Sequence, residues 1–303
     1  MRRLFLPLMF LAGIILMYSG CVSQDTGQIH DQGKTAAPEE GTEVKKVREE
    51  VHLVSKELSY YPDGVLATYR VYTYAEEGVQ KLEEELYNSD DELLERKVFK
   101  YENGNQRSKQ TYQGLGELLQ TYDGNGELIQ YHIFKYSDAG LITEDSLYDM
   151  NDELRTRQEF EYDKGGNKTE WRVFNTDGAL LSYTGYEYEN GLNTVIKNHS
   201  PDGVLLDRFL LEYDSDARLV KRTWFSGDGA VKQIRIFIYR NGGLIEEQVL
   251  LANRSIRRKI IYTNNSSGDP LEVVYMDGAG NIREILAFEY VNRTRVTYTR
   301  VKE

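Results

Sequence analysis

Aromatic side chains are the residues of this sequence best suited to binding. Trp171 and Trp224 offer large ring faces, and Tyr183, Tyr186 and Tyr188 stand close together in one short stretch. Such rings stack against sugars, and neighbouring carboxylates can accept hydrogen bonds from sugar hydroxyl groups. Alternatively, the rings pair across strands and only stabilise a sheet, by about 0.2–1 kcal/mol per pair. These five residues are therefore a possible binding surface for a glycan or a peptide.

Two loops place oxygen-bearing side chains at alternate positions, as calcium-binding loops do. These loops are Asp123, Asn125 and Glu127, and then Asp149, Asn151 and Glu153. Neither is followed by a bidentate glutamate at a suitable distance, and hairpin turns use the same residue types. We therefore expect neither a metal site nor a cofactor.

Catalysis has little support in the sequence. No nucleophile elbow, zinc signature or phosphate loop is present, so we expect no catalytic residues. The histidines are scattered at His30, His52, His132 and His199. Carboxylates are too numerous for one pair to stand out. A glycoside hydrolase therefore stays an alternative, and it requires two carboxyl groups about 5–10 Å apart in a cleft.

The only cysteine, Cys21, follows a segment that is typical of an export signal. Residues 1–20 begin with Arg2 and Arg3 and continue with an apolar run that ends in small polar residues. The ending YSGC resembles the lipobox of bacterial lipoproteins, although Tyr18 stands where an aliphatic residue is usual. The resemblance implies cleavage before Cys21 and a lipid anchor on it. Val22 and Ser23 lack the aspartate that often retains lipoproteins at the inner membrane, which favours the outer membrane.

Residues 21–50 contain few large apolar side chains and are expected to form a flexible tether. One alternative is a short helix at the end of this segment, because five aliphatic residues fall at helical spacing: Val44, Val47, Val51, Val54 and Leu58. The formal net charge of −12 makes nucleic acid an unsuitable partner.

The possible binding residues belong to a sequence repeat that occupies most of residues 51–303. One landmark is an aromatic or aliphatic residue, any residue, a tyrosine and then a turn, as in Phe160 and Tyr162 before DKGG. The other is an aromatic residue, a polar loop and an aliphatic residue, as in Phe174 before NTDGAL. The landmarks alternate every 12 to 14 residues, and Ile260 with Tyr262 is assigned to the first type. A full unit is about 26 residues long.

Each unit is predicted to be a β-hairpin. Phe160 and Tyr162 would project to one face of a strand, while Glu159 and Glu161 project to the other. The fold class is therefore all-β: a repetitive antiparallel β-meander of about nine two-strand units, forming an extended, twisted or curled open sheet. Residues 114–133 contain a tandem copy, GELLQTY and GELIQYH, and are expected to form a loop or an irregular short hairpin.

The segments FEYDKGGN, LEYDSDARLV and KYSDAGLI resemble the YD repeats of bacterial Rhs-type proteins and eukaryotic teneurins. The second landmark, with its DGxL ending, is similar to MORN-type repeats. The resemblance implies a continuous antiparallel sheet that coils as its strands twist. Full Rhs proteins have many more repeats, which close into a hollow shell around a toxin. We expect an open curved sheet or a partial barrel for this shorter array.

The expected function is that of a lipid-anchored binding or scaffolding module of the bacterial envelope, with an unknown protein, peptide or glycan as its partner. The alternatives are an enzyme that degrades envelope polysaccharide and an immunity protein that inhibits a toxin. The final strand carries Arg293, Arg295, Arg300 and Lys302. These charges either discourage edge-to-edge aggregation or dock an acidic partner.

Overall fold

The computed structural model describes residues 42–75, 79–101 and 117–302, and these residues form strands and turns without a helix. None of the described segments is a helix long and apolar enough to cross a membrane. The strands are β1 (Thr42–Tyr60), β2 (Leu66–Tyr74), β3 (Lys81–Asn88), β4 (Leu93–Tyr101), β5 (Glu117–Asp123), β6 (Leu128–Tyr136), β7 (Ile142–Asp149), β8 (Leu154–Tyr162), β9 (Lys168–Phe174), β10 (Leu180–Glu189), β11 (Leu192–His199), β12 (Leu205–Tyr213), β13 (Leu219–Ser226), β14 (Val231–Arg240), β15 (Gly243–Leu251), β16 (Ile256–Asn264), β17 (Pro270–Asp277) and β18 (Ile282–Lys302).

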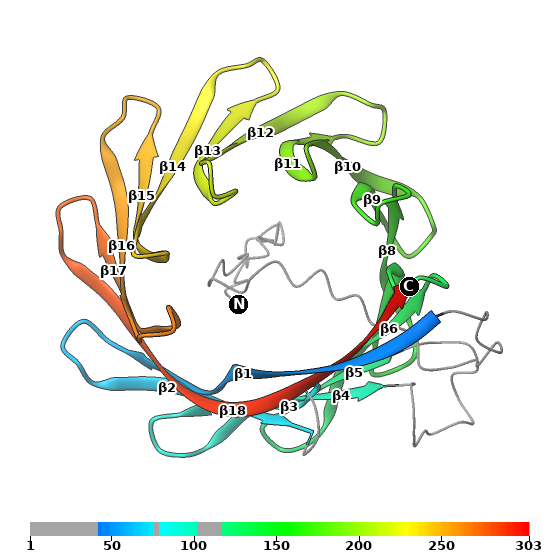
Figure 1. Cartoon of the computed structure of the whole chain (residues 1–303), viewed down its shortest axis with the longest axis horizontal. Helices are drawn as coiled ribbons and strands as arrows, with labels where there is room; N and C mark the ends of the chain where they lie inside the picture. Colours follow the sequence, from blue (N-terminus) through cyan, green and yellow to red (C-terminus); the bar gives the residue numbers. More distant parts are fainter. Residues whose placement is uncertain (1–41, 76–78, 102–116, 303) are drawn as a thin grey trace, which may run out of the picture.

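All eighteen strands belong to one antiparallel meander, as the repeat predicts. Each strand pairs with the next, and β1 also pairs with β18, from Thr42 opposite Lys302 to Tyr60 opposite Ile285. The sheet therefore closes into a barrel (Figure 1), and the expectation of an open sheet is wrong. Twist and a bulge at nearly every hairpin add up over the ring, and closure satisfies two strand edges that would otherwise be unpaired.

The N-terminal strand begins earlier than the sequence suggests. Residues 42–50, which we assigned to the end of the tether, form the first half of β1 and pair with the last residues of β18. The helix considered around Val54 and Leu58 is absent, because both residues lie in β1. Cys21, the predicted lipid-anchor residue, and the rest of the predicted tether lie outside the described residues.

The turns follow from local side-chain chemistry. Asp163 donates its N–H to the carbonyl oxygen of Asn167 (2.9 Å), and Gly166, at φ 82°, donates back to the carbonyl oxygen of Asp163 (3.1 Å). The Asp163 carboxylate accepts the N–H groups of Gly165 and Asn167, at 2.8 and 2.9 Å. The side chain and N–H of Asn167 hold the pKa of Asp163 below its ordinary value. Aspartate and asparagine thus recur after the strands because they bond their own turn.

The repeat tyrosine has a structural role. The Tyr162 hydroxyl donates to the carbonyl oxygen of Ile142, the first residue of the preceding strand, at 2.8 Å. Equivalent bonds 20 residues apart join Tyr74 to Val54, Tyr188 to Lys168, Tyr213 to Asn193, Tyr239 to Leu219 and Tyr290 to Pro270. In the β15–β16 hairpin the bond comes from Asn264 to Leu244, at 2.8 Å. The landmark of that unit is therefore Tyr262 with Asn264, two residues later than we assigned it.

The irregular segment of the repeat is a regular part of the barrel. Residues 117–123 form β5, which pairs in full with both β4 and β6. Our expectation of a loop or an irregular hairpin is wrong for these residues. The tandem copy gives two successive strands, which keeps the number of strands even and lets the last strand lie antiparallel to the first. The remainder, residues 114–116, lies outside the described residues.

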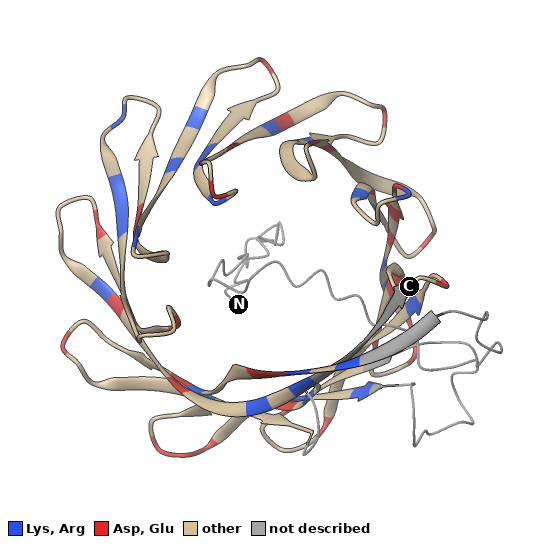
Figure 2. Ribbon diagram, in the orientation of Figure 1, with Lys and Arg blue, Asp and Glu red and all other residues tan. Residues whose placement is uncertain are grey.

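Side chains alternate between an inner and an outer face of the barrel, as the spacing of Phe160 and Tyr162 predicts. The inner face includes the best-buried cluster, Ile260, Val273 and Leu286, which packs against Tyr262, Tyr275 and Phe288. Leu286 is only 1% exposed because side chains converge on the concave side of a closed sheet. Lys and Arg, together with Asp and Glu, occur all around the ring (Figure 2).

Candidate ligand-binding face

Four of the five aromatic residues singled out in the sequence lie on the inner face. Trp171, Tyr186, Tyr188 and Trp224 share this face, and each is partly exposed. Tyr183 lies on the outer face, where its ring stacks on His199 at a centroid distance of 4.6 Å. Trp171 and Trp224 are four strand spacings apart, or about 19 Å at about 4.8 Å per spacing. The rings therefore line a long wall and do not form one compact site.

Around Trp171 the wall combines a ring with polar side chains. Trp171 stacks on Phe160 of β8 at a centroid distance of 6.4 Å, and Thr184 lies opposite it on β10. From Thr184 a row of polar contacts crosses the next strands, because Thr184 Oγ1 donates to Asn198 Oδ1 (2.8 Å) and Asn198 Nδ2 to Asp207 Oδ1 (2.6 Å). The Trp171 indole N–H is buried and has no hydrogen-bond partner among the described residues.

The two inner tyrosines beside Trp171 differ in whether their hydroxyl groups are hydrogen-bonded. The Tyr188 hydroxyl is used by the repeat, since it donates to the carbonyl oxygen of Lys168. Tyr186 makes no such bond within the described part of the chain, and burial raises its pKa to about 12. Lys168 covers the Phe160 ring, 4.5 Å from its centroid, and burial lowers the pKa of this ammonium group. Tyr186 is therefore the tyrosine of this wall with a hydroxyl left for a ligand.

A second group on the inner face surrounds Trp224. The Trp224 ring stacks on Phe209 of β12 at 5.9 Å, and its buried indole N–H also has no partner among the described residues. Arg222 lies two residues before Trp224, and its guanidinium carbon is 5.4 Å from the Phe209 ring centroid. On β14, Arg235 lies directly opposite Arg222. This group therefore places two guanidinium groups beside a ring stack.

A buried ion pair adjoins this second group. Arg235 Nη1 lies 3.1 Å from Glu247 Oε2, and the Glu247 side chain is only 2% exposed. The hydroxyl of Tyr262 donates to the other oxygen of Glu247, and burial and this carboxylate raise the pKa of Tyr262 well above its ordinary value. Glu247 is thus ion-paired with Arg235 and hydrogen-bonded to Tyr262, while its Oε2 accepts no hydrogen bond from the described residues.

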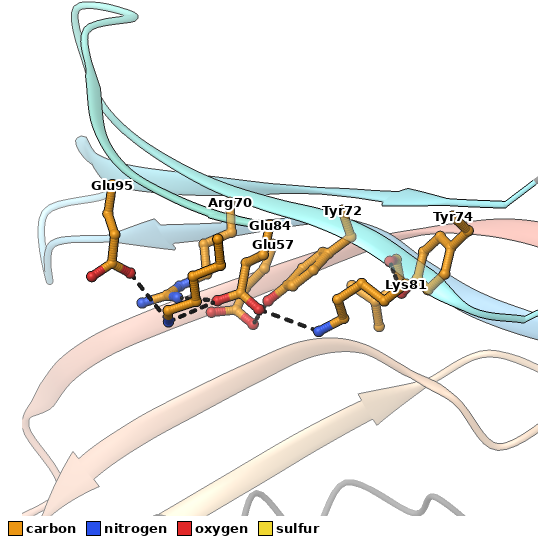
Figure 3. A network of polar contacts seen from close by, with 9 residues as sticks. Glu57, Arg70, Tyr72, Tyr74, Lys81, Glu84 and Glu95 are labelled. Atoms are coloured by element: carbon orange, nitrogen blue, oxygen red, sulfur yellow. Dashed lines mark hydrogen bonds and ion pairs between the residues drawn. The ribbon is translucent and has the colours of Figure 1, made fainter. Parts of the chain in front are cut away.

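The sequence analysis missed a polar network on β1 to β4. Arg70 Nη1 lies 2.7 Å from Glu84 Oε1, and Lys81 Nζ lies 3.2 Å from Glu84 Oε2. Lys97 reaches the same carboxylate at 3.4 Å, and the Tyr72 hydroxyl donates to Glu57 at 3.4 Å. Figure 3 shows the side chains that it labels, Glu57, Arg70, Tyr72, Lys81 and Glu84 among them, projecting together from neighbouring strands. The signal in the sequence was charge at inner-face positions, but only the pairing of the strands reveals the partners.

The two carboxylates of this network differ in their proton affinity. Burial raises the pKa of Glu57, and Arg70 and Tyr72 only partly oppose that effect. Burial also acts to raise the pKa of Glu84, but Lys81, Lys97 and Arg70 outweigh it and hold the value below the ordinary one. The network therefore joins two carboxyl groups whose pKa values are shifted in opposite directions.

The outer face carries ion pairs between exposed side chains. Lys221 Nζ lies 2.7 Å from Glu212 Oε1, and these side chains are 39% and 54% exposed. Arg172 bridges Glu161 and Glu170 from the adjacent strand and its own. Such pairs are solvated and contribute little stability each. Both faces therefore carry ion pairs, but the inner pairs are buried or partly buried and the outer pairs are solvated.

The loops that resemble calcium sites are hairpin turns. Asp123 Oδ1 accepts the N–H groups of Asn125 and Glu127, and Asp149 Oδ1 accepts those of Asn151 and Glu153. The described residues contain no group of three or more histidine, cysteine, aspartate or glutamate side chains that could hold a metal ion. The backbone of the turn therefore accounts for the alternate oxygens in these loops.

The described histidines are far apart in the barrel. His52 pairs with Asp269 at 2.8 Å, and His132 pairs with Asp145 at 2.7 Å, while His199 stacks on Tyr183. In the terminal strand, Arg295 Nε lies 3.9 Å from Glu49 of β1, so this basic strand has a partner within the barrel itself. The docking of an acidic partner on it stays a prediction.

Comparisons with known proteins leave the family of this chain open. No family model and no curated protein matches the chain. Among solved structures, TcdB2-TccC3 without its hypervariable C-terminal region is similar at 12% identity, with a TM-score of 0.32. That likeness covers 73% of this chain but only 15% of the other. A porin-like protein from Bacteroides uniformis is similar at 12% identity over 82% of this chain and 98% of its own, with a TM-score of 0.38. At these TM-scores neither likeness carries an argument about function.

Proposed function

We propose that this chain is a non-catalytic binding module of the bacterial cell envelope, held on the membrane by lipid at Cys21. Its ligand is an extended glycan, bound along the inner face of the barrel. The binding surface is therefore the inner wall of the barrel, whereas the sequence suggested the exposed face of an open sheet. If the tests below show that a peptide binds and a glycan does not, the ligand is a peptide.

One observation carries the proposal: both tryptophans of the chain lie on the inner face, partly exposed, with indole N–H groups that lack partners in the described residues. A buried donor without a partner costs about 1–3 kcal/mol, which a ligand oxygen would recover. The Thr184 hydroxyl lies opposite Trp171 and donates to the amide oxygen of Asn198 on the next strand. Flat rings beside such groups suit the alternating apolar and hydroxyl surfaces of a sugar.

The outer face supports the same assignment. Its solvated ion pairs, such as Lys221 with Glu212, suit contact with water. In this proposal the lipid anchor is the means by which the chain is held on a membrane. Replacing Cys21 with alanine should release the protein into the soluble fraction of fractionated cells. Retention of the variant in the membrane fraction would contradict the anchor.

Intrinsic fluorescence tests the binding site directly, because the chain contains only two tryptophans. In single-tryptophan variants Trp171→Phe and Trp224→Phe, neutral and acidic oligosaccharides from envelope polymers should shift the emission of the remaining indole. Iodide quenching should decrease when ligand covers the ring. An oligosaccharide panel that leaves both signals unchanged, while peptides change them, would exclude a glycan as the ligand.

The polysaccharide-degrading enzyme stays as a second candidate because of Glu57 and Glu84. Their opposed pKa shifts, within one network on β1 to β3, are the pattern expected of an acid and a base. An enzyme would release reducing ends from a polysaccharide, and Glu57→Gln would abolish that release. Absence of product with wild-type protein across the panel would reject this candidate and leave the binding function in place.

A further inference from the structure

Arg222 is a cation on the inner face whose charge is not matched by a described carboxylate. Its guanidinium group forms no ion pair or hydrogen bond with the described residues. It makes a cation–π contact with the Phe209 ring. Burial, together with the neighbouring Arg235, lowers the pKa of its guanidinium group, and the carboxylate of Glu247 only partly opposes this shift. A charge held in this way costs free energy that a bound anion would offset.

The surroundings of Arg222 identify the kind of anion. Arg235, opposite it on β14, is already neutralised by Glu247, so the pair of arginines has room for one further negative charge. A guanidinium group presents a planar fork that matches a carboxylate in two parallel hydrogen bonds. Trp224, two residues away on the same face, offers a ring and an unpaired indole N–H. These groups suit a carboxylate attached to a sugar ring.

We infer that Arg222 and Trp224 form a subsite for an acidic sugar unit, with the sugar carboxylate on Arg222 and the ring against Trp224. This inference rests on the proposed function and specifies the class of glycan as one that contains uronic acid. Arg235 stays paired with Glu247 and adds positive potential behind the carboxylate. The inner wall around Trp171, four strands away, binds neutral sugar units of the same glycan.

The test uses tetragalacturonic acid and its methyl ester, which differ in charge and share one sugar backbone. In the Trp171→Phe variant, the fluorescence of Trp224 reports on the subsite. The acid should bind about tenfold more tightly than the ester, as expected for one charge-assisted bidentate contact. The preference should decrease as salt is raised.

A matched pair of arginine variants isolates the role of Arg222. Arg208 lies on the outer face of the same β12–β13 hairpin, and its guanidinium carbon is 5.0 Å from the Phe225 ring centroid. Arg222→Gln should remove the preference for the acid and keep the affinity for the ester within about twofold. Arg208→Gln should keep the preference, and circular dichroism should show both variants folded.

The possible outcomes separate the two proposals. Equal binding of acid and ester, or a preference that survives Arg222→Gln, would overturn the acidic subsite and leave the glycan-binding function standing. Loss of the preference in Arg208→Gln would also overturn it, because the effect would then come from general charge. No response to either compound or to neutral oligosaccharides would overturn the binding function and the subsite together.

Discussion

The β12–β13 hairpin presents nearly the same chemistry to its two faces. On the outer face Arg208 covers Phe225, and Glu212 pairs with Lys221 in water. On the inner face Arg222 covers Phe209 beside Trp224, and it has no described carboxylate partner. Closure of the sheet makes the difference, because only the concave face is shielded by strands from the rest of the ring. Removing a charge should therefore change the free energy of unfolding far more on the inner face than on the outer face.

The largest effect is expected from the buried pair of Arg235 and Glu247. Glu247→Ala leaves Arg235 buried without its partner, which typically costs about 3–5 kcal/mol. The matched outer variant, Glu212→Ala, breaks an exposed pair and should cost no more than about 1 kcal/mol. Urea unfolding followed by circular dichroism measures both. Equal losses would mean that the inner face is as well solvated as the outer one.

Packing on the two faces should differ in the same direction. Leu286 is 1% exposed in a cluster with Val273 and Ile260, so Leu286→Ala should cost about 2–5 kcal/mol through lost burial and a cavity. Leu206 on the outer face is 50% exposed, and Leu206→Ala should change stability by less than about 0.5 kcal/mol. The free energy of unfolding in urea again gives the comparison. A large loss at Leu206 would indicate that the outer face is covered in solution.

The repeat tyrosine gives a smaller effect. Tyr213→Phe removes the hydrogen bond from the hydroxyl to the carbonyl oxygen of Asn193 and should cost about 0.5–1.5 kcal/mol. Tyr183→Phe is the control, because the Tyr183 hydroxyl has no hydrogen bond within the described residues. Thermal unfolding of the two variants should separate them. Identical melting temperatures would remove the structural explanation for the recurring spacing of 20 residues between bonded partners.

The contribution of the inner tyrosines to stability should be independent of pH near neutral pH and dependent on pH in alkali. Burial raises the pKa of Tyr74 and of Tyr186 from 10.0 to about 12. Because the folded value exceeds the unfolded one, this stability is fully present below about pH 10 and is lost as pH rises toward 12. Tyr186→Phe should reduce the loss. Urea unfolding between pH 9 and 12 tests this, and an unchanged pH profile in the variant would contradict it.

Much of the fold could be predicted from particular residues. The alternation of Phe160 and Tyr162 with Glu159 and Glu161 gave the strands and their two faces correctly, because side chains alternate in any strand. The turn after Tyr162 was predictable, since Asp163 and Gly166 are the residue types that such a turn needs. These features depend on neighbours in the sequence.

Closure and the inner polar groups could not be predicted in the same way. Closure depends on small increments of twist summed over eighteen strands, and no single residue encodes it. The approach of Arg70 to Glu84 requires the register between β2 and β3, and the position of Arg222 opposite Arg235 requires that between β13 and β14. Tyr183 was placed with Tyr186 because they are close in sequence, but their odd spacing puts them on opposite faces.

Closure of the sheet by β1 and β18 is the central claim, and an engineered disulfide tests it most directly. Glu50 and Thr294 are exposed and lie opposite each other across this pair of strands, at a separation that a disulfide can span. In a Cys21→Ser background, Glu50→Cys with Thr294→Cys should form an intramolecular disulfide in monomeric protein under mild oxidation. The account predicts a faster-migrating, reducible monomer on non-reducing gels. Free thiols, or only intermolecular dimers, would show that the first and last strands do not meet.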